Sequence, residues 1–173
     1  MMRHLATILL LIAITGCTSK YRVDSYEGPT ARLDKQASFY VVLPRDGQYE
    51  QRAYQGSGAS TASAVATALL VHVDKVVTGA VSGEDLESAL ATARERGLSH
   101  VFNIMILHWE DRATEWSGIT DKITLKLAVY ETQSGRPVSS TVTSASSKWG
   151  TMGGDHPQDL LPQPIKTFVD GLF

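Results

Sequence analysis

The residues best suited to chemistry are three carboxylates that lie between two tryptophans: Trp109, Glu110, Asp111, Glu115 and Trp116. Paired carboxylates beside aromatic rings would suit the cleavage or binding of a glycan. We expect them to form a ligand loop between two strands, where binding residues often lie. Because acid pairs are common in solvated loops, the favoured interpretation is a loop that its tryptophans hold against the sheet. Glycan chemistry is the alternative.

Other motifs give no catalytic assignment. The chain has no G-x-S-x-G, H-E-x-x-H or Walker motif. His100 and His108 would share one face of a strand but lie about 26 Å apart, which is too far for a shared metal ion. Gly56-Ser57-Gly58 lacks the lysine of a phosphate-binding loop and predicts a helix start with a serine cap. We therefore expect no metal, no cofactor and no enzymatic activity.

The single cysteine, Cys17, follows a stretch typical of a signal peptide. Arg3 begins a short cationic start, residues 5–14 are almost entirely apolar, and Gly16 precedes the cysteine. About ten apolar residues suit a signal peptide, whereas a spanning helix needs about twenty. Residues 14–17 resemble a bacterial lipobox, which implies that Cys17 is acylated and becomes the mature N-terminus. A buried free cysteine after an ordinary cleavage site is the alternative.

The resemblance also implies a location. In lipoproteins of Gram-negative bacteria, an aspartate after the acylated cysteine commonly favours the inner membrane, and this chain has Thr18 there. If the host is Gram-negative, we expect a lipid anchor in the outer membrane with the protein facing the periplasm.

Composition restricts the class of protein. The chain has 173 residues, of which 43% are hydrophobic and 20% charged, with a formal net charge of -2. These values fit one globular domain and exclude a disordered tail, a collagen-like fibre and a multi-pass membrane protein. The weak negative charge argues against a nucleic-acid partner, and one cysteine excludes a disulfide scaffold.

We expect three segments: a signal peptide (1–16), Cys17, acylated as the lipobox resemblance implies, with a flexible tether (17–36), and a single α/β domain (37–173). A tether of some twenty residues would reach about 70 Å. The alternative is an extended segment laid along the domain surface.

Within the domain, we expect strands near 37–43, 76–77, 100–109, 123–130 and 138–147, and helices near 60–73, 82–96 and 160–172. Ser82 and Asp85 have the spacing of a capping box. The predicted fold is α/β (α+β), with a single mixed β-sheet of about four to five strands and three packing helices.

The Ser/Thr-rich strand at 138–147 is the predicted interface. It follows a hairpin, and we expect it at a sheet edge, where Val138, Ser140, Val142 and Ser144 would receive a partner strand. A merely solvated edge strand is the alternative.

Several features together resemble a family of uncharacterised bacterial lipoproteins, domain-of-unknown-function family 4823. They are the lipobox, the strand ending at Pro44, Glu115-Trp116 before the 123–130 strand, and the stretch from Pro157 to Pro164. The family carries no catalytic assignment. The order of elements is more remotely similar to the small α/β domain of curli-secretion and TolB-type periplasmic proteins, which bind other proteins.

We therefore expect a non-enzymatic, membrane-anchored lipoprotein of the bacterial envelope. Its partners would be membrane lipid, through acylated Cys17, and an unknown envelope protein that it binds or helps to assemble. A peptidoglycan- or glycan-binding or glycan-cleaving lipoprotein is the alternative.

Overall fold

The computed structural model describes residues 19–111, 120–147 and 156–173. In chain order the elements are β1 (Lys20–Glu27), β2 (Ser38–Val41), β3 (Gln48–Tyr49), β4 (Arg52–Ala53), α2 (Ser57–Leu69), β5 (Lys75–Thr78), α3 (Leu86–Glu95), β6 (His100–Glu110), β7 (Lys122–Glu131), β8 (Pro137–Ser146), the 3-10 helix η1 (Pro157–Leu160) and α4 (Pro162–Asp170). No helix within those ranges is long and apolar enough to cross a membrane.

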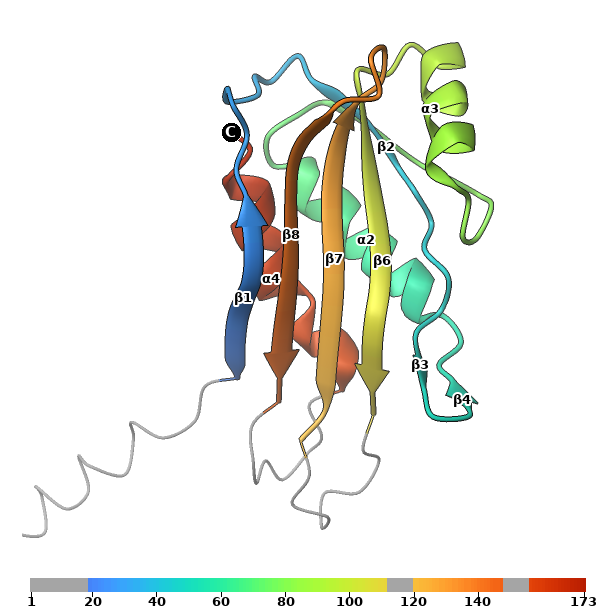
Figure 1. Cartoon of the computed structure of the whole chain (residues 1–173), viewed down its shortest axis with the longest axis vertical. Helices are drawn as coiled ribbons and strands as arrows, with labels where there is room; N and C mark the ends of the chain where they lie inside the picture. Colours follow the sequence, from blue (N-terminus) through green and yellow to red (C-terminus); the bar gives the residue numbers. More distant parts are fainter. Residues whose placement is uncertain (1–18, 112–119, 148–155) are drawn as a thin grey trace, which may run out of the picture.

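The predicted mixed sheet is confirmed, but it has six strands rather than four to five. Their order is β1-β8-β7-β6-β2-β5 (Figure 1). β2 pairs in parallel with β5 and β6, and the other pairs are antiparallel. β3 and β4 form a separate two-stranded pair beside β6. The additional strand is β1.

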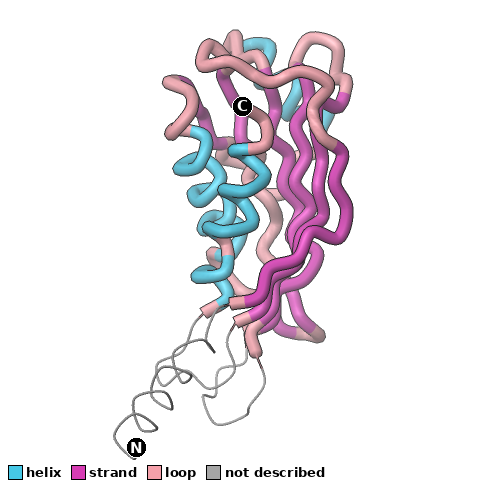
Figure 2. Tube along the Cα trace, turned by 90° about the vertical axis from the view of Figure 1, so that its left-hand side faces the viewer, coloured by secondary structure: helices cyan, strands magenta, loops and turns pink. Residues whose placement is uncertain are grey.

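Helices cover the two faces of the sheet unequally. On one face, α2 and α4 pack along the sheet over a core that includes Phe39, Val41 and Leu125 (Figures 1 and 2). On the other face, α3 covers only a smaller cluster that includes Tyr40 and Val42. β2 is therefore apolar on both alternating faces, because it lies between two helical layers.

The helices α2 and α3 begin at other residues than predicted, because aspartate side chains before each helix accept hydrogen bonds from the amides of its first turn. Gly56, in the left-handed conformation at φ 86°, has no capping side chain, and the Asp46 carboxylate accepts from the amide of Gly58 at 2.8 Å. α3 begins at Leu86 rather than near Ser82, since Asp85 is its N-cap and accepts from the Ser88 amide at 3.0 Å. The Ser82 hydroxyl instead donates to the Pro44 carbonyl.

The predicted flexible tether is wrong over residues 20–27, where the alternative of an extended surface segment holds. These residues form β1, antiparallel to β8, with Lys20 opposite Ser146 and Glu27 opposite Ser140. The sequence conceals this strand because nearly all its side chains are exposed, so no apolar alternation marks it. Backbone pairing with β8, rather than burial of side chains, therefore holds β1 in the sheet.

Buried hydroxyl groups of β8 add to this pairing. Ser139, Thr141 and Thr143 face the helical layer and are at most 4% exposed. Their hydroxyls donate to backbone carbonyls of β1, on Glu27 at 2.7 Å, Ser25 at 2.7 Å and Arg22 at 3.0 Å. A buried hydroxyl without a partner destabilises a fold by about 1–3 kcal/mol. The Ser/Thr composition of β8 therefore suits a strand with a neighbour.

Candidate functional site

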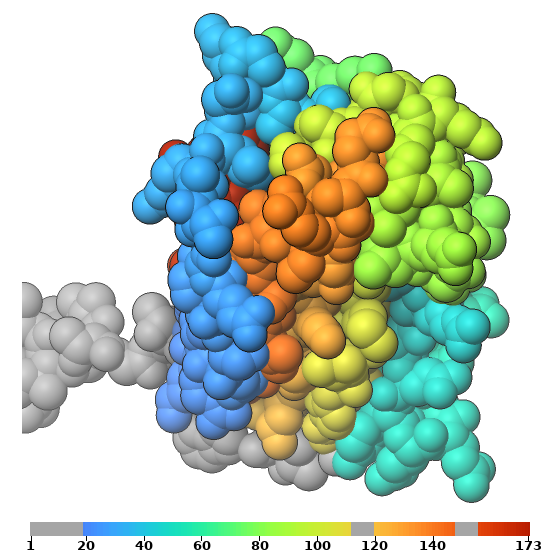
Figure 3. Space-filling view, turned by 45° about the horizontal axis from the view of Figure 1, so that its top comes forward, coloured from blue at the N-terminus to red at the C-terminus, as the bar shows by residue number. Residues whose placement is uncertain are grey.

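Within residues 19–111, 120–147 and 156–173, no helix covers the sheet face opposite α2 and α4 over β1, β8, β7 and the end of β6; we call it the open face (Figures 1 and 2). Its side chains alternate with core residues and form cross-strand rows. From one end of the strands, the rows are Glu110, Lys122, Ser146 and Lys20; His108, Thr124, Ser144 and Arg22; Met105, Lys126, Val142 and Ser25; and Asn103, Ala128, Ser140 and Glu27. In Figure 3, β1 (blue) and α3 (yellow-green) stand at its two borders.

The middle row of the open face carries two apolar side chains, Met105 and Val142. Met105 is 49% exposed although it lies in a central strand, and Val142 is half-buried two strands away in the same row. Lys126 lies between them, and its long aliphatic stem can cover apolar surface. Hydroxyl-bearing and charged side chains surround this row. An apolar centre with a polar rim is the usual anatomy of a protein-binding surface.

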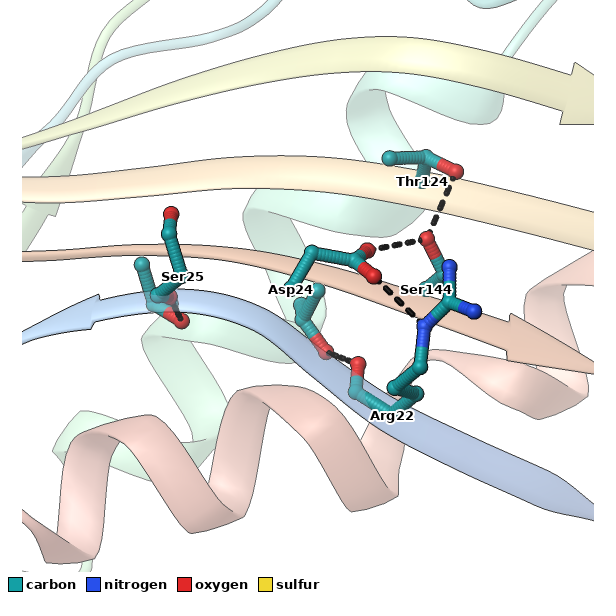
Figure 4. A network of polar contacts seen from close by, with 7 residues as sticks. Arg22, Asp24, Ser25, Thr124 and Ser144 are labelled. Atoms are coloured by element: carbon teal, nitrogen blue, oxygen red, sulfur yellow. Dashed lines mark hydrogen bonds and ion pairs between the residues drawn. The ribbon is translucent and has the colours of Figure 1, made fainter.

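A polar network crosses the open face from β1 to β7 (Figure 4). The Asp24 carboxylate, at an irregularity in the pairing of β1, accepts from the Ser144 hydroxyl at 2.6 Å and from Arg22 Nε at 2.6 Å. The Ser144 hydroxyl also lies 3.0 Å from that of Thr124. The hydrogen bond from Ser144, followed by the bond and charge of Arg22, holds the pKa of Asp24 below its ordinary value of 3.8.

The predicted partner edge is wrong, because β8 lies between β1 and β7 and has no free side. Three of its four residues nevertheless reach a surface: Ser140, Val142 and Ser144 are half-buried on the open face. Val138 instead lies at a shift in the β7–β8 register and packs partly against the main core. Sequence reasoning identified these open-face residues of β8 but placed them at an edge.

Trp109 agrees with the favoured interpretation, in which the tryptophans hold this segment against the sheet, and it lies in β6, within the strand predicted at 100–109. Glu110 also belongs to β6 rather than to a connection, which corrects the predicted start of the loop. Trp109 is 2% exposed and its ring packs against Gly47, so it offers no stacking surface for a sugar. Asp111 follows the strand and is half-buried, whereas Glu115 and Trp116 lie outside the described residues. Trp109 therefore contributes to the core.

The histidines do not form a common site. His108 Nε2 lies 3.0 Å from the buried Glu110 carboxylate, and its ring meets Tyr49 edge-on. His100 is half-buried and stacks on Phe39 of the core, and this burial lowers its pKa. The register shift between residues 106 and 108 places the two histidines on opposite faces, rather than on one face as predicted. Among the described residues, no three His, Cys, Asp or Glu side chains are grouped to hold a metal ion.

Replacing Ser144 by alanine should raise the pKa of Asp24 toward 3.8, because its main hydrogen-bond donor is lost. Carbon-detected NMR titration of the carboxyl group measures this change. A lowered folded pKa stabilises the fold above pH 3.8, and the contribution disappears as the pH falls through the folded value. Ser140→Ala, on the same face but bonded to Glu27, is the matched control. An unchanged Asp24 midpoint in Ser144→Ala would contradict the assignment.

Comparison with known proteins places the fold among bacterial structures. A PelC dodecamer from Paraburkholderia phytofirmans has a TM-score of 0.66 and 15% identity, covering 90% of this chain and 97% of that one. Protein XCC0632 from Xanthomonas campestris has a TM-score of 0.52 and 12% identity, covering 83% of this chain and 91% of that one. At these identities the likeness is one of fold. No curated protein matches the chain.

The sequence itself matches a family described as a domain of unknown function over residues 31–172, from the segment after β1 to the residues that follow α4. The predicted membership is therefore confirmed, and the protein belongs to the DUF4823 family.

Proposed function

We propose that this protein is a lipid-anchored module of the bacterial envelope that binds another protein through its open face. Its location would be the periplasmic side of the outer membrane, with acylated Cys17 as the anchor. The observation that carries the binding role is the uncovered sheet face with Met105 and Val142 at its centre. The lipobox-like residues 14–17 support the anchor.

The size of the open face suits such a role. Four strands about 4.8 Å apart and about eight residues long present roughly 500 Å² in flat projection. One partner in a standard protein interface contributes about 800 Å² of accessible surface, so the open face could supply most of such a contact. The similar PelC chain is described as a dodecamer, which makes a second copy of this chain the first partner to test.

Acylation predicts that Cys17→Ala releases the protein from the membrane fraction. Each buried methylene contributes about 0.8 kcal/mol, so several acyl chains anchor a protein firmly. Cell fractionation with a high-salt wash, together with the intact mass of the native protein, measures both anchoring and acylation. Ser19→Ala, which keeps the cysteine, should remain in the membrane. Retention of Cys17→Ala after the wash, or an unmodified native mass, would contradict this part of the proposal.

The binding role predicts that a photocrosslinking amino acid at position 105 gives discrete protein adducts in living cells. The same amino acid at position 71 is the control, because Val71 is 77% exposed on the opposite, helical side. Adding Val142→Glu, directly opposite Lys126, should reduce the adducts at least about tenfold, because a partner would have to desolvate this carboxylate together with the Lys126 ammonium group, at a cost of more than about 1.4 kcal/mol.

Circular dichroism would check that the Val142→Glu protein keeps its fold. Adducts that form equally at positions 105 and 71, or that persist unchanged in the folded Val142→Glu protein, would contradict a binding role for the open face. An adduct of two copies of the chain would identify the partner as the protein itself.

A further inference from the structure

Four strands begin or end at the same end of the sheet. The register aligns Lys20 with Ser146, Ser146 with Lys122, and Lys122 with Glu110. β1 and β7 begin at this row, and β6 and β8 end near it, as the arrowheads in Figure 1 show. We call Lys20, Ser146 and Lys122 the end row.

The chain between the end row and Cys17 is very short. Only Thr18 and Ser19 separate Cys17 from Lys20, where β1 begins. Three residue steps span at most about 11 Å. A tether reaching to residue 36 would have let the domain stand well away from the bilayer, but pairing of β1 with β8 removes that length.

The charges of the end row suit a phospholipid surface. Lys20 and Lys122 are exposed, and neither has an ion-pair partner among the described residues. Both belong to the same cross-strand row of the open face, two strands apart, which corresponds to about 10 Å. The acid of this row, Glu110, is buried and lies beside His108. Ammonium groups near a bilayer bind the phosphates of its headgroups.

We infer that the end row contacts phospholipid headgroups, with Lys20 and Lys122 against their phosphates. This inference rests on the proposed acylation of Cys17. The membrane then lies across one end of the open face, so a partner reaches that face beside the bilayer surface. The β7–β8 hairpin stands away from the membrane, since ten residues of β7 extend about 33 Å.

Fluorescence quenching in vesicles tests the position of the end row. The probe is full-length acylated protein labelled at Ser146→Cys, because the thioether of acylated Cys17 does not react with maleimides. Vesicles of phosphatidylethanolamine and phosphatidylglycerol would carry headgroup-nitroxide lipid. We expect the label at 146 to lose most of its fluorescence, and a label at the exposed Gln133, beyond the far end of β7, to lose little.

Two variants separate the tether from the lysines. Inserting about ten Gly and Ser residues after Ser19 adds about 17 Å of root-mean-square reach and should relieve much of the quenching. Lys20→Gln with Lys122→Gln should also reduce it at low salt, whereas Lys126→Gln, farther along the same face, should not.

Quenching that is equal at 146 and 133, or absent at 146 in protein whose mass shows acylation, would overturn the inference and leave the proposed anchor intact. Unchanged quenching with the longer tether would overturn it as well. Unchanged quenching in the double glutamine variant would overturn the phosphate contacts. A protein that carries no acyl group would instead refute the proposed function on which the inference rests.

Discussion

The pairing of β1 with β8 is the interaction on which the arrangement of this protein depends. Ser139, Thr141 and Thr143 are buried polar residues in a sheet face that otherwise packs against helices. Their hydroxyls donate to backbone carbonyls of β1, which supplies acceptors although its own side chains are mostly exposed. One strand thus covers the otherwise free side of β8, satisfies the buried hydroxyls and widens the open face.

The same pairing links the residue that we propose as the lipid anchor to the surface that we propose for binding. β1 follows Cys17 after two residues and contributes Arg22, Asp24 and Ser25 to the open face or its border. The Asp24 carboxylate joins β1 to Ser144 of β8 on that face. The proposed anchor, the edge strand β1 and the proposed binding surface would therefore be directly connected, and the protein would present its open face close to the bilayer.

Much of the fold could be predicted from the sequence, because alternation and helical spacing report side-chain burial. The 123–130 alternation correctly separates the core residues Ile123, Leu125 and Leu127 from Thr124 and Lys126 on the open face. The β1 strand could not be found this way, because backbone and hydroxyl contacts hold it. For the same reason β8 was mistaken for an edge.

The candidate site was predictable only in part. The Ser/Thr composition of β8 predicts an interface at Ser140, Val142 and Ser144, whereas no local pattern distinguishes Met105 within an apolar strand. Its exposure follows from α3, which covers the start of β6 near Val101 but does not extend to Met105. Coverage by a helix distant in sequence is a tertiary property that no local pattern reports. The burial of Trp109 likewise depends on a segment distant in sequence, because its side chain packs against Gly47.

Amide hydrogen exchange over residues 20–27 of the acylated, full-length chain tests the central claim most directly. An edge strand bonds alternate amides to its single neighbour, so the account predicts alternating slow and fast exchange on either side of the irregularity at Asp24. Uniformly fast exchange at all these amides would contradict it, because residues 20–27 would then form a free tether and β8 an open edge.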